Sequence, residues 1–300
     1  MVEIPAGTFR MGSNEHYPEE GPARSVSVDA FSIDPFQVTN RQYAEFVADT
    51  GYVTVAEQPL DPAQYPGAPV ENLLPGSLVF TMTAGPVDLQ HLSQWWRWTP
   101  GACWRHPDGP ESSVDGREDE PVVHVAAEDA EAYASWAGKS LPTEAEWERA
   151  ARGGLEGATY VWGDDPEPAA ERLANYWHGE FPWRHDEGYG TRQPVGCYPA
   201  NGFGLHDTAG NVWEWTRDWY VERSPEPAAP CCVPHNPRGG GLEESYDPAQ
   251  PQFRIPRKVV KGGSYLCADT YCLRYRPAAR RPQMVDTGMS HIGFRCVVRS

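Results

Sequence analysis

The stretch Leu141-Pro142-Thr143-Glu144-Ala145-Glu146-Trp147-Glu148 begins one of the clearest helices that the sequence predicts. Thr143 and Glu146 have the spacing of a capping box, in which the side chain of each residue accepts a hydrogen bond from the backbone N–H of the other. Gly153-Gly154 then ends the segment, because glycine readily adopts the left-handed conformation that stops a helix. We therefore expect a short helix between Thr143 and Gly153. The stretch Gly210-Asn211-Val212-Trp213-Glu214-Trp215 is the second one that bears on the fold.

Further helices and strands are predicted on both sides of these stretches. Thr39 and Gln42 form another capping box, and residues 43–47 then carry apolar side chains at helical spacing. A third helix is expected from Asp129 to Ala137, with Gly138 as its end. Short alternating or β-branched runs predict strands at residues 2–4, 8–11, 26–33, 259–260 and 294–298.

Glycine and proline interrupt the pattern elsewhere. The chain has 300 residues with 29 Gly, 30 Pro, 12 Trp and 14 Tyr, a composition that predicts irregular loops pinned by buried aromatic rings. Residues 56–120 are too long for an ordinary loop, so we expect them to be ordered by packing of Trp95, Trp96, Trp98 and Trp104. Residues 223–258 are proline-rich and predict a surface insertion. Without a repeat or a linker, the expectation is one α+β domain over residues 1–300 with little regular secondary structure.

The charge and hydropathy of the chain exclude several classes of protein. The net charge of −17 argues against nucleic acid binding, which needs a clustered basic face. An acidic surface suits a cationic peptide partner or simply solubility. No apolar run approaches the roughly 20 residues of a membrane span, and residues 1–5 do not have the pattern of a signal peptide. We therefore expect a cytoplasmic protein without nucleic acid or membrane partners.

Seven cysteines stand out, because a disulfide framework is not expected in a reducing cytoplasm. Cys267 and Cys272 are five positions apart, which places their sulfurs on opposite sides of a strand and about 140° apart on a helix. A shared site therefore requires a turn at residues 268–270, where Asp269 favours turns. Nearby arginines would favour thiolates over thiols.

Four interpretations of this cysteine pair stay open on spacing alone. The cysteines could be inert and buried, or they could form a disulfide. A zinc site would need further ligands, for which His291 and Cys296 are candidates. Two thiolates could also hold a soft, low-coordinate Cu(I) ion.

The wider sequence context resembles a known family. The C-terminal region contains Lys261-Gly262-Gly263-Ser264-Tyr265-Leu266-Cys267, Tyr271-Cys272-Leu273-Arg274-Tyr275-Arg276, Ala278-Ala279-Arg280 and Gly293-Phe294-Arg295-Cys296. These segments resemble the C-terminal core of formylglycine-generating enzymes. Supporting segments across nearly the whole chain are Ile4 to Phe9, Trp104-Arg105-His106-Pro107, Asn201 to Leu205 and the two stretches quoted first.

The segments differ in what they specify. Leu141 to Glu148 and Gly210 to Trp215 resemble the whole sulfatase-modifying superfamily and imply its irregular fold, a relative of the C-type lectin fold. That superfamily also includes sulfoxide synthases and non-catalytic peptide- or sugar-binding relatives, which are the alternative functions. A sulfoxide synthase would need His-x-x-x-His-x-Glu, a spacing that none of the nine histidines has. The cysteine segment resembles only the formylglycine generators and implies an oxidase.

The resemblance implies a mechanism and a set of catalytic residues. Cys267 and Cys272 would hold Cu(I), and the substrate cysteine would join them as a third sulfur ligand. Oxygen would be activated at copper and a hydrogen removed from the substrate β-carbon, giving a thioaldehyde that hydrolyses to the aldehyde. Ser264 and Tyr271 match positions near the metal and oxygen pocket, and Trp213 matches its aromatic wall.

The implied substrate is an unfolded or nascent sulfatase polypeptide with the motif Cys-x-Pro-x-Arg, held as an extended peptide. O2 and a thiol reductant would be the other partners, and a monomer is the family-like expectation. Ala134, Ala151 and Pro277 stand where secreted relatives carry extra disulfide cysteines, and Cys296 is therefore expected to be a buried thiol.

Two structural calcium sites are also implied by the resemblance. The first would combine the side chains of Asp207 and Glu214 with the carbonyls of Gly210 and Val212, a mixture of oxygen ligands that suits Ca²⁺.

The second calcium site would use Asn175, an acid near Glu187 and the carbonyls of Tyr176 and Tyr189. Glu187 departs from the pattern, which more often has Asp, and Asp186 is adjacent. The alternative to calcium is that these turn residues cap their own backbone.

Overall fold

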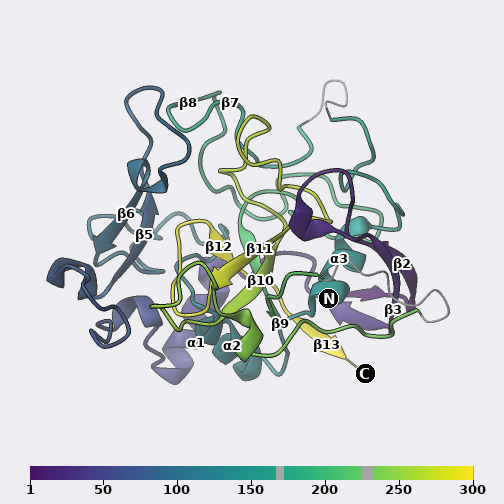
Figure 1. Cartoon of the computed structure of the whole chain (residues 1–300), viewed down its shortest axis with the longest axis horizontal. Helices are drawn as coiled ribbons and strands as arrows, with labels where there is room; N and C mark the ends of the chain where they lie inside the picture. Colours follow the sequence, from purple (N-terminus) through teal and green to yellow (C-terminus); the bar gives the residue numbers. More distant parts are fainter. Residues whose placement is uncertain (167–171, 224–232, 300) are drawn as a thin grey trace.

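The computed structural model describes residues 1–166, 172–223 and 233–299. These residues form three α-helices: α1 (Asn40–Thr50), α2 (Ala127–Trp136) and α3 (Glu144–Arg152). Most of the remaining chain is short strands and irregular segments, and α1 and α2 lie at the lower edge of the view in Figure 1.

The capping boxes form as predicted. Thr143 accepts a hydrogen bond from the Glu146 amide at 3.1 Å, and Glu146 accepts one from the Thr143 amide at 2.7 Å. Gly153 ends α3 in the left-handed conformation with φ +57°. The same pairing of Thr39 with Gln42 begins α1. Both helix starts are therefore determined by side chains within one turn of the helix.

Helix α2 begins two residues earlier than the predicted Asp129. The Asp129 carboxylate accepts a hydrogen bond from the Ala126 amide at 2.8 Å, so this acid caps the helix from inside its first turn. The helix ends at Trp136, and Gly138 follows with φ +67°.

A four-stranded sheet lies at the centre of the molecule, with the order β11-β10-β9-β12. It consists of β9 (Trp213–Trp219), β10 (Arg257–Lys261), β11 (Arg280–Met284) and β12 (Ile292–Gly293). Strand β12 is parallel to β9, and the other pairs are antiparallel. The segment that joins β10 to β11 contains both cysteines of the predicted site.

The two chain ends meet in a second sheet, with the order β1-β4-β13, formed by β1 (Val2–Ile4), β4 (Phe31–Ile33) and β13 (Val297–Arg299). Figure 1 shows both termini on the same side of the molecule. Next to this sheet, β2 (Gly7–Met11) and β3 (Arg24–Val28) form a hairpin, and helix α3 packs on it and on the central sheet.

The predicted strand at residues 294–298 is only partly formed. Val297–Arg299 pairs with β4, whereas Phe294 and Cys296 are fully buried without belonging to a strand. Their carbonyls instead accept hydrogen bonds from the amides of Val38 and Asp34, two residues of an irregular segment.

Residues 56–120 contain a hairpin that was not predicted from the sequence, made of β5 (Gly76–Phe80) and β6 (Trp96–Pro100). Short 3₁₀ helices precede and interrupt it at Val55–Glu57, Val70–Leu73 and Leu92–Gln94, in addition to those at Pro18–Glu20 and Glu243–Ser245. Trp95 and Trp104 are buried, but in two separate apolar clusters. Trp96 and Trp98 are only partly buried. The tryptophans therefore order this region by packing on different parts of the domain.

A last short hairpin, β7 (Gly179–Glu180) and β8 (Arg184–His185), lies before the central sheet in the chain. The predicted insertion at 223–258 includes Cys231 and Cys232, which lie outside the described residues. Its far end overlaps β10, which begins at Arg257. Among the described helices, none is long and apolar enough to cross a membrane.

Candidate active site

The turn predicted between Cys267 and Cys272 is present. The Tyr271 and Cys272 amides both donate to the carbonyl of Ala268, at 3.1 and 2.7 Å. This turn brings the two Sγ atoms to 3.2 Å from each other, longer than the bonded S–S distance of about 2.05 Å. Both cysteines are free thiols. The turn thus places two sulfurs in one site, which neither a straight strand nor a helix could do.

The two thiols have different environments. A hydrogen bond from Cys267 lowers the pKa of Cys272, and the Arg274 guanidinium, 3.8 Å from its sulfur, acts in the same direction. Burial raises the pKa of Cys267 well above its usual value, and the neighbouring sulfur adds to this effect. Cys272 is therefore the thiol that loses its proton more readily, and Cys267 is the donor within the pair.

The cysteine pair lies on the wall of a cavity of about 330 Å³, hereafter the cysteine cavity. Ser264, Tyr271 and Trp213, the other predicted catalytic residues, line the same cavity. The structure therefore brings together five side chains that come from two separate regions of the sequence. Further lining residues are Glu19, Leu92, Trp95, Trp96, Phe181, Leu266, Arg274, Arg281, Pro282 and His291.

Two glycines allow the backbone to turn between the end of β10 and the cysteine loop. Gly262 and Gly263 have φ of +93° and +73° and turn the chain away from the end of β10 toward Ser264. A Cβ on Gly263 would lie 2.8 Å from the Arg274 carbonyl oxygen, closer than real contacts allow. Only glycine fits here, because both the conformation and the space exclude a side chain.

Aromatic rings form the floor below Tyr271. Its ring stacks on Phe181 with centroids 4.6 Å apart and an interplanar angle of 4°, and it meets Trp95 edge-on at 5.7 Å. The Trp177 amide donates to the Cys267 carbonyl at 2.8 Å. The loop is thus fixed by stacking on one side and a main-chain hydrogen bond on the other.

Trp213 and His291 form another part of the wall. The Trp213 amide donates to the His291 carbonyl at 2.8 Å, next to the parallel pairing of β9 with β12. The His291 Nδ1 atom is buried and has no hydrogen-bond partner among the residues that the structure describes. Burial also lowers the pKa of His291 well below its usual value, so the cavity contains a neutral imidazole at neutral pH.

The N-terminal segment holds the outer side of the cysteine loop. The Leu273 amide donates to the Tyr17 hydroxyl at 3.0 Å, and the Arg274 guanidinium lies 3.7 Å from the centre of the Tyr17 ring. Glu19 pairs with Arg274 at 2.8 Å. The residue beside Cys272 is therefore held by a segment about 250 positions away in sequence.

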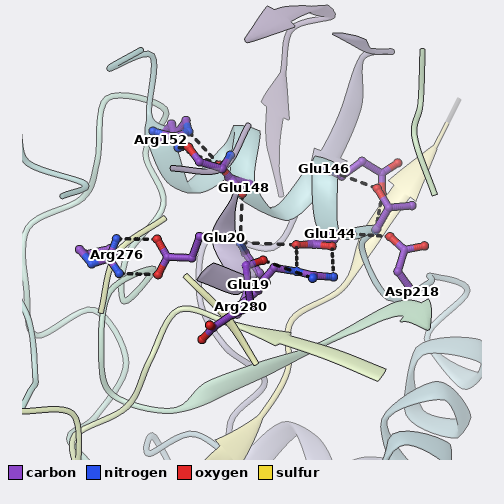
Figure 2. Close-up of polar contacts among 12 residues, drawn as sticks. Glu19, Glu20, Glu144, Glu146, Glu148, Arg152, Asp218, Arg276 and Arg280 are labelled. Atoms are coloured by element: carbon purple, nitrogen blue, oxygen red, sulfur yellow. Dashed lines mark hydrogen bonds and ion pairs between the residues drawn. The ribbon is translucent and has the colours of Figure 1, made fainter. Parts of the chain in front are cut away.

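Arg276 and Arg280, which follow Arg274 in the sequence, are paired internally. Figure 2 shows Arg276 facing Glu20 and Arg280 facing Glu144, each through two dashed contacts. Arg276 and Glu20 are almost completely buried. These ion pairs fasten the 3₁₀ helix Pro18–Glu20 and helix α3 to the segment between the cysteine loop and the start of β11, so both arginines are structural and do not form a basic surface.

Lys261, at the end of β10, belongs to the same buried network. Its ammonium group lies 3.0 Å from Glu148, and both side chains are completely buried. Glu148 also pairs with Arg152 at 2.8 Å and accepts a hydrogen bond from the Gly12 amide. A single carboxylate is thus shared by two buried cations, one of which directly precedes the glycine pair of the active-site loop.

The alternatives for the cysteine pair can now be compared. Among the described residues, no group of three or more His, Cys, Asp or Glu side chains is arranged to hold a metal ion. Cys296 is a buried free thiol in the core, as expected, and does not line the cysteine cavity. The donor set is therefore two adjacent sulfurs, which fits a soft, low-coordinate ion such as Cu(I) better than zinc with four ligands.

In the first predicted calcium site, the Glu214 carboxylate is already hydrogen-bonded by other protein groups. Glu214 accepts four hydrogen bonds, two at each oxygen, from Gln37, Trp147 and Arg295. A carboxylate offers about four lone-pair positions, and all are used here. Gln37 also donates to the Val212 carbonyl, and Asp207 accepts a hydrogen bond from the Gly196 amide. Because every lone-pair position of Glu214 is used by protein donors, Glu214 does not fit a calcium ligand in this arrangement.

The second predicted calcium site is different. Within the described ranges of the chain, the Asn175 Oδ1 atom is buried and has no hydrogen-bond partner, although its amide nitrogen donates to Thr191 and Asn211. Tyr189 is also buried, Tyr176 is partly buried, and Glu187 is exposed. An unpaired buried oxygen is costly unless a cation or water reaches it, so Asn175 fits a calcium ligand.

Several residues of the cysteine cavity could not be found from the sequence. Glu19, Leu92 and Phe181 carry no local signal of a site, because they come from three segments that meet only in the folded domain. His291 was a candidate from the sequence only as a zinc ligand, and its place in the wall beside Trp213 was not predicted.

Comparison with known proteins gives a consistent result. Residues 1–300 match the family described as sulfatase-modifying factor enzyme 1-like domain. The formylglycine-generating enzyme of Mycobacterium tuberculosis is 54% identical over 99% of this chain and 97% of that protein. The formylglycine-generating enzyme of Thermomonospora curvata is 44% identical over 99% of this chain and 92% of that protein.

A solved structure supports the fold independently. The structure of PvdO from Pseudomonas aeruginosa is similar with a TM-score of 0.62 at 21% identity, over 99% of this chain and 92% of that one. The predicted irregular α+β fold is thereby confirmed. On the family match over residues 1–300 and the identity to these relatives, the chain belongs to the sulfatase-modifying factor family of formylglycine-generating enzymes.

Proposed function

We propose that this protein is a formylglycine-generating oxidase, which converts the cysteine of a Cys-x-Pro-x-Arg segment in a sulfatase polypeptide to formylglycine. One observation carries the proposal. Cys267 and Cys272, whose segment resembles only the formylglycine generators, have their sulfurs 3.2 Å apart on the wall of a cavity. The relatives named formylglycine-generating enzyme support the same activity.

The net reaction balances with one external reductant. The substrate cysteine gives up two electrons and two hydrogens as its CH2–SH group becomes an aldehyde. A thiol reductant supplies two further electrons, and together they reduce one O2 to water. Four electrons in all convert O2 to two water molecules. A water molecule then hydrolyses the thioaldehyde, so the aldehyde oxygen comes from water and the sulfur leaves as hydrogen sulfide.

The side chains around the cavity have separable tasks in this proposal. The neighbouring Arg274 guanidinium favours the thiolate of Cys272, and Cys267 is held against it by the turn at Ala268. The aromatic rings of Trp213 and Tyr271 exclude water from the wall on which the substrate sulfur would lie. The Ser264 hydroxyl supplies a hydrogen-bonding group beside them.

We propose Cu(I) as the cofactor that the two sulfurs hold. When bound, it would provide the chemistry by which O2 is activated. The donor chemistry supports this choice, because two soft thiolates prefer Cu(I) to hard cations. A structural calcium ion is proposed only for the second site, through the unpaired Asn175 oxygen. A cytoplasmic location and a monomeric state complete the proposal, and the five described cysteines, all unpaired, are compatible with a reducing compartment.

The test is a peptide assay. Protein loaded with Cu(I) is given O2, a thiol reductant and a Cys-x-Pro-x-Arg peptide, and the product is identified by mass spectrometry after trapping the aldehyde with a hydroxylamine. An aldehyde that forms only with copper and O2 both present would support the activity and the cofactor. Binding of the peptide without conversion under every metal tested would instead favour a non-catalytic relative.

A matched pair of variants makes the assay specific. Cys272→Ser should abolish aldehyde formation and weaken Cu(I) binding, because the second sulfur is lost. Cys197→Ser is the control, since Cys197 is an exposed free thiol that lies outside the cavity. Equal rates for both variants would rule out the cysteine pair as the catalytic group.

A further inference from the structure

A second cavity of about 390 Å³ adjoins the cysteine cavity. Its walls come from the hairpin β5–β6, the 3₁₀ helix Leu92–Gln94, strand β11 and the segment after Glu243–Ser245. We call it the side cavity. Its apolar lining residues are Leu78, Leu92, Trp96, Met284 and Met289. No predicted catalytic residue belongs to it.

The two cavities share a wall. Leu92, Trp96, Arg281 and Pro282 line both of them. Because the same four side chains border both spaces, a chain leaving the cysteine cavity across this wall enters the side cavity directly. Both volumes lie within the usual range of roughly 300–1,000 Å³ for ligand sites.

The side cavity is open to an apolar partner. Leu92, on the shared wall, is 45% exposed, although leucine is usually buried. Asp247 and Arg257 line the side cavity but not the cysteine cavity, and they pair with each other at 3.4 Å, so they neutralise one another. The walls thus offer apolar surface without an uncompensated charge at the far end.

Arg281 is the exception on the shared wall. Its side chain has no hydrogen-bond or ion-pair partner within the described part of the chain, unlike Arg274, Arg276 and Arg280. A guanidinium has five N–H donors. Arg281 lines both cavities, so its donors are available at the wall that the two cavities share.

We propose that the side cavity binds the client polypeptide beside its Cys-x-Pro-x-Arg core, taking one large apolar side chain while Arg281 donates to the client main chain. This inference rests on the proposed function, because it takes the occupant of the cysteine cavity to be a polypeptide. The occupant is an extended chain whose side chains enter neighbouring pockets, a common mode of peptide recognition. The side cavity therefore extends recognition beyond the core motif.

The experiment compares peptides that differ only in length. The target cysteine is replaced by serine so that the peptides bind without reacting. One peptide is the core alone, one is extended with apolar residues on the N-terminal side, and one is extended in the same way on the C-terminal side. The dissociation constant of each is measured by fluorescence anisotropy with the metal-free and the Cu(I)-loaded protein.

Two variants and one control test whether the extra affinity of an extended peptide comes from the side cavity and its shared wall. Met284→Trp fills the side cavity from a partly buried position that does not line the cysteine cavity. Leu155→Trp is the control, because it places the same ring on an exposed residue that lines neither cavity. Arg281→Gln removes the charge and most of the donors from the shared wall.

One extended peptide should bind at least about tenfold more tightly than the core, the effect expected for burying one large apolar side chain. Met284→Trp should remove that gain without changing the affinity of the core, Arg281→Gln should reduce the gain, and Leu155→Trp should preserve it. Equal binding of core and extended peptides, or a Met284→Trp effect on the core as large as on the extended peptide, would overturn the side-cavity inference alone. Failure of every peptide to bind would overturn the proposed function as well.

Discussion

The buried carboxylate of Glu148 gives the sharpest test of how the active-site loop is supported. Glu148→Gln keeps the size and shape of the side chain and removes its charge. Lys261 and Arg152, both buried, then face a neutral amide. Lys261 keeps only a distant carboxylate, Glu144 at 4.0 Å. The variant therefore leaves buried cations without their main counterion.

The expected loss follows from burial. Removing one partner of a buried ion pair typically costs about 3–5 kcal/mol, because an uncompensated charge remains in a poorly hydrated environment. Two cations lose the same counterion here, so the cost should lie in that range and not at the level of about 0–1 kcal/mol for exposed pairs. Since whole domains are stable by only about 5–15 kcal/mol, the loss should be large enough to measure easily.

Urea unfolding followed by tryptophan fluorescence measures this loss, since the chain contains 12 tryptophans. Glu243→Gln is the matched control, because Glu243 and Arg254 form a pair in which both side chains are about three-quarters exposed. The free energy of unfolding should fall by about 3–5 kcal/mol for Glu148→Gln and by less than about 0.5 kcal/mol for the control. Equal changes in the two variants would show that the buried network does not stabilise the domain as argued.

Three further outcomes are expected. Gly263→Ala should lower the free energy of unfolding by about 1–3 kcal/mol and reduce peptide oxidation, because its Cβ would clash with the Arg274 carbonyl. Gly51→Ala is the control, since Gly51 has a similar φ without any close contact, and it should leave oxidation unchanged. Equal oxidation rates in the two variants would refute the clash. Burial lowers the pKa of His124 to about 4 from 6.5. As the pH drops from 6.5 to about 4, the unfolded chain therefore binds a proton at this histidine that the folded chain does not, and the free energy of unfolding should fall. The free energy of unfolding of His124→Asn should depend less on pH, and the same dependence in variant and wild type would contradict this. Ca²⁺ should raise the melting temperature of the wild type but not of Asn175→Ala. Differential scanning fluorimetry measures this, with Mg²⁺ as the comparison ion. An equal rise in both proteins would exclude the Asn175 site.

Local chemistry made part of this protein predictable from its sequence. The starts of α1 and α3 follow from capping boxes that span three residues, and the end of α3 follows from a glycine in the left-handed conformation. The turn between Cys267 and Cys272 could be inferred because no regular element brings both sulfurs together. In each case the partners lie within a few positions of one another, so spacing is sufficient evidence.

Segments without a local period were not predictable. Hairpin β5–β6 lies in a region with no sustained alternation, and its strands are stabilised by aromatic side chains of residues 177 and 181, far along the chain. The pattern around Glu214 likewise suggested a calcium ligand, whereas the fold brings Arg295 from 81 positions away to the same carboxylate.

The sequence by itself therefore determined the starts of α1 and α3, the end of α3, the cysteine turn and the family, because short-range hydrogen bonds and contiguous motifs carry that information. Only the tertiary structure decided what surrounds the cysteines. Glu19 on the outer side of the loop, Leu92 on the shared wall and His291 beside Trp213 come from segments that no motif connects. Their meeting depends on long-range packing and buried ion pairs, whose partners are chosen by the whole fold and not by neighbouring residues.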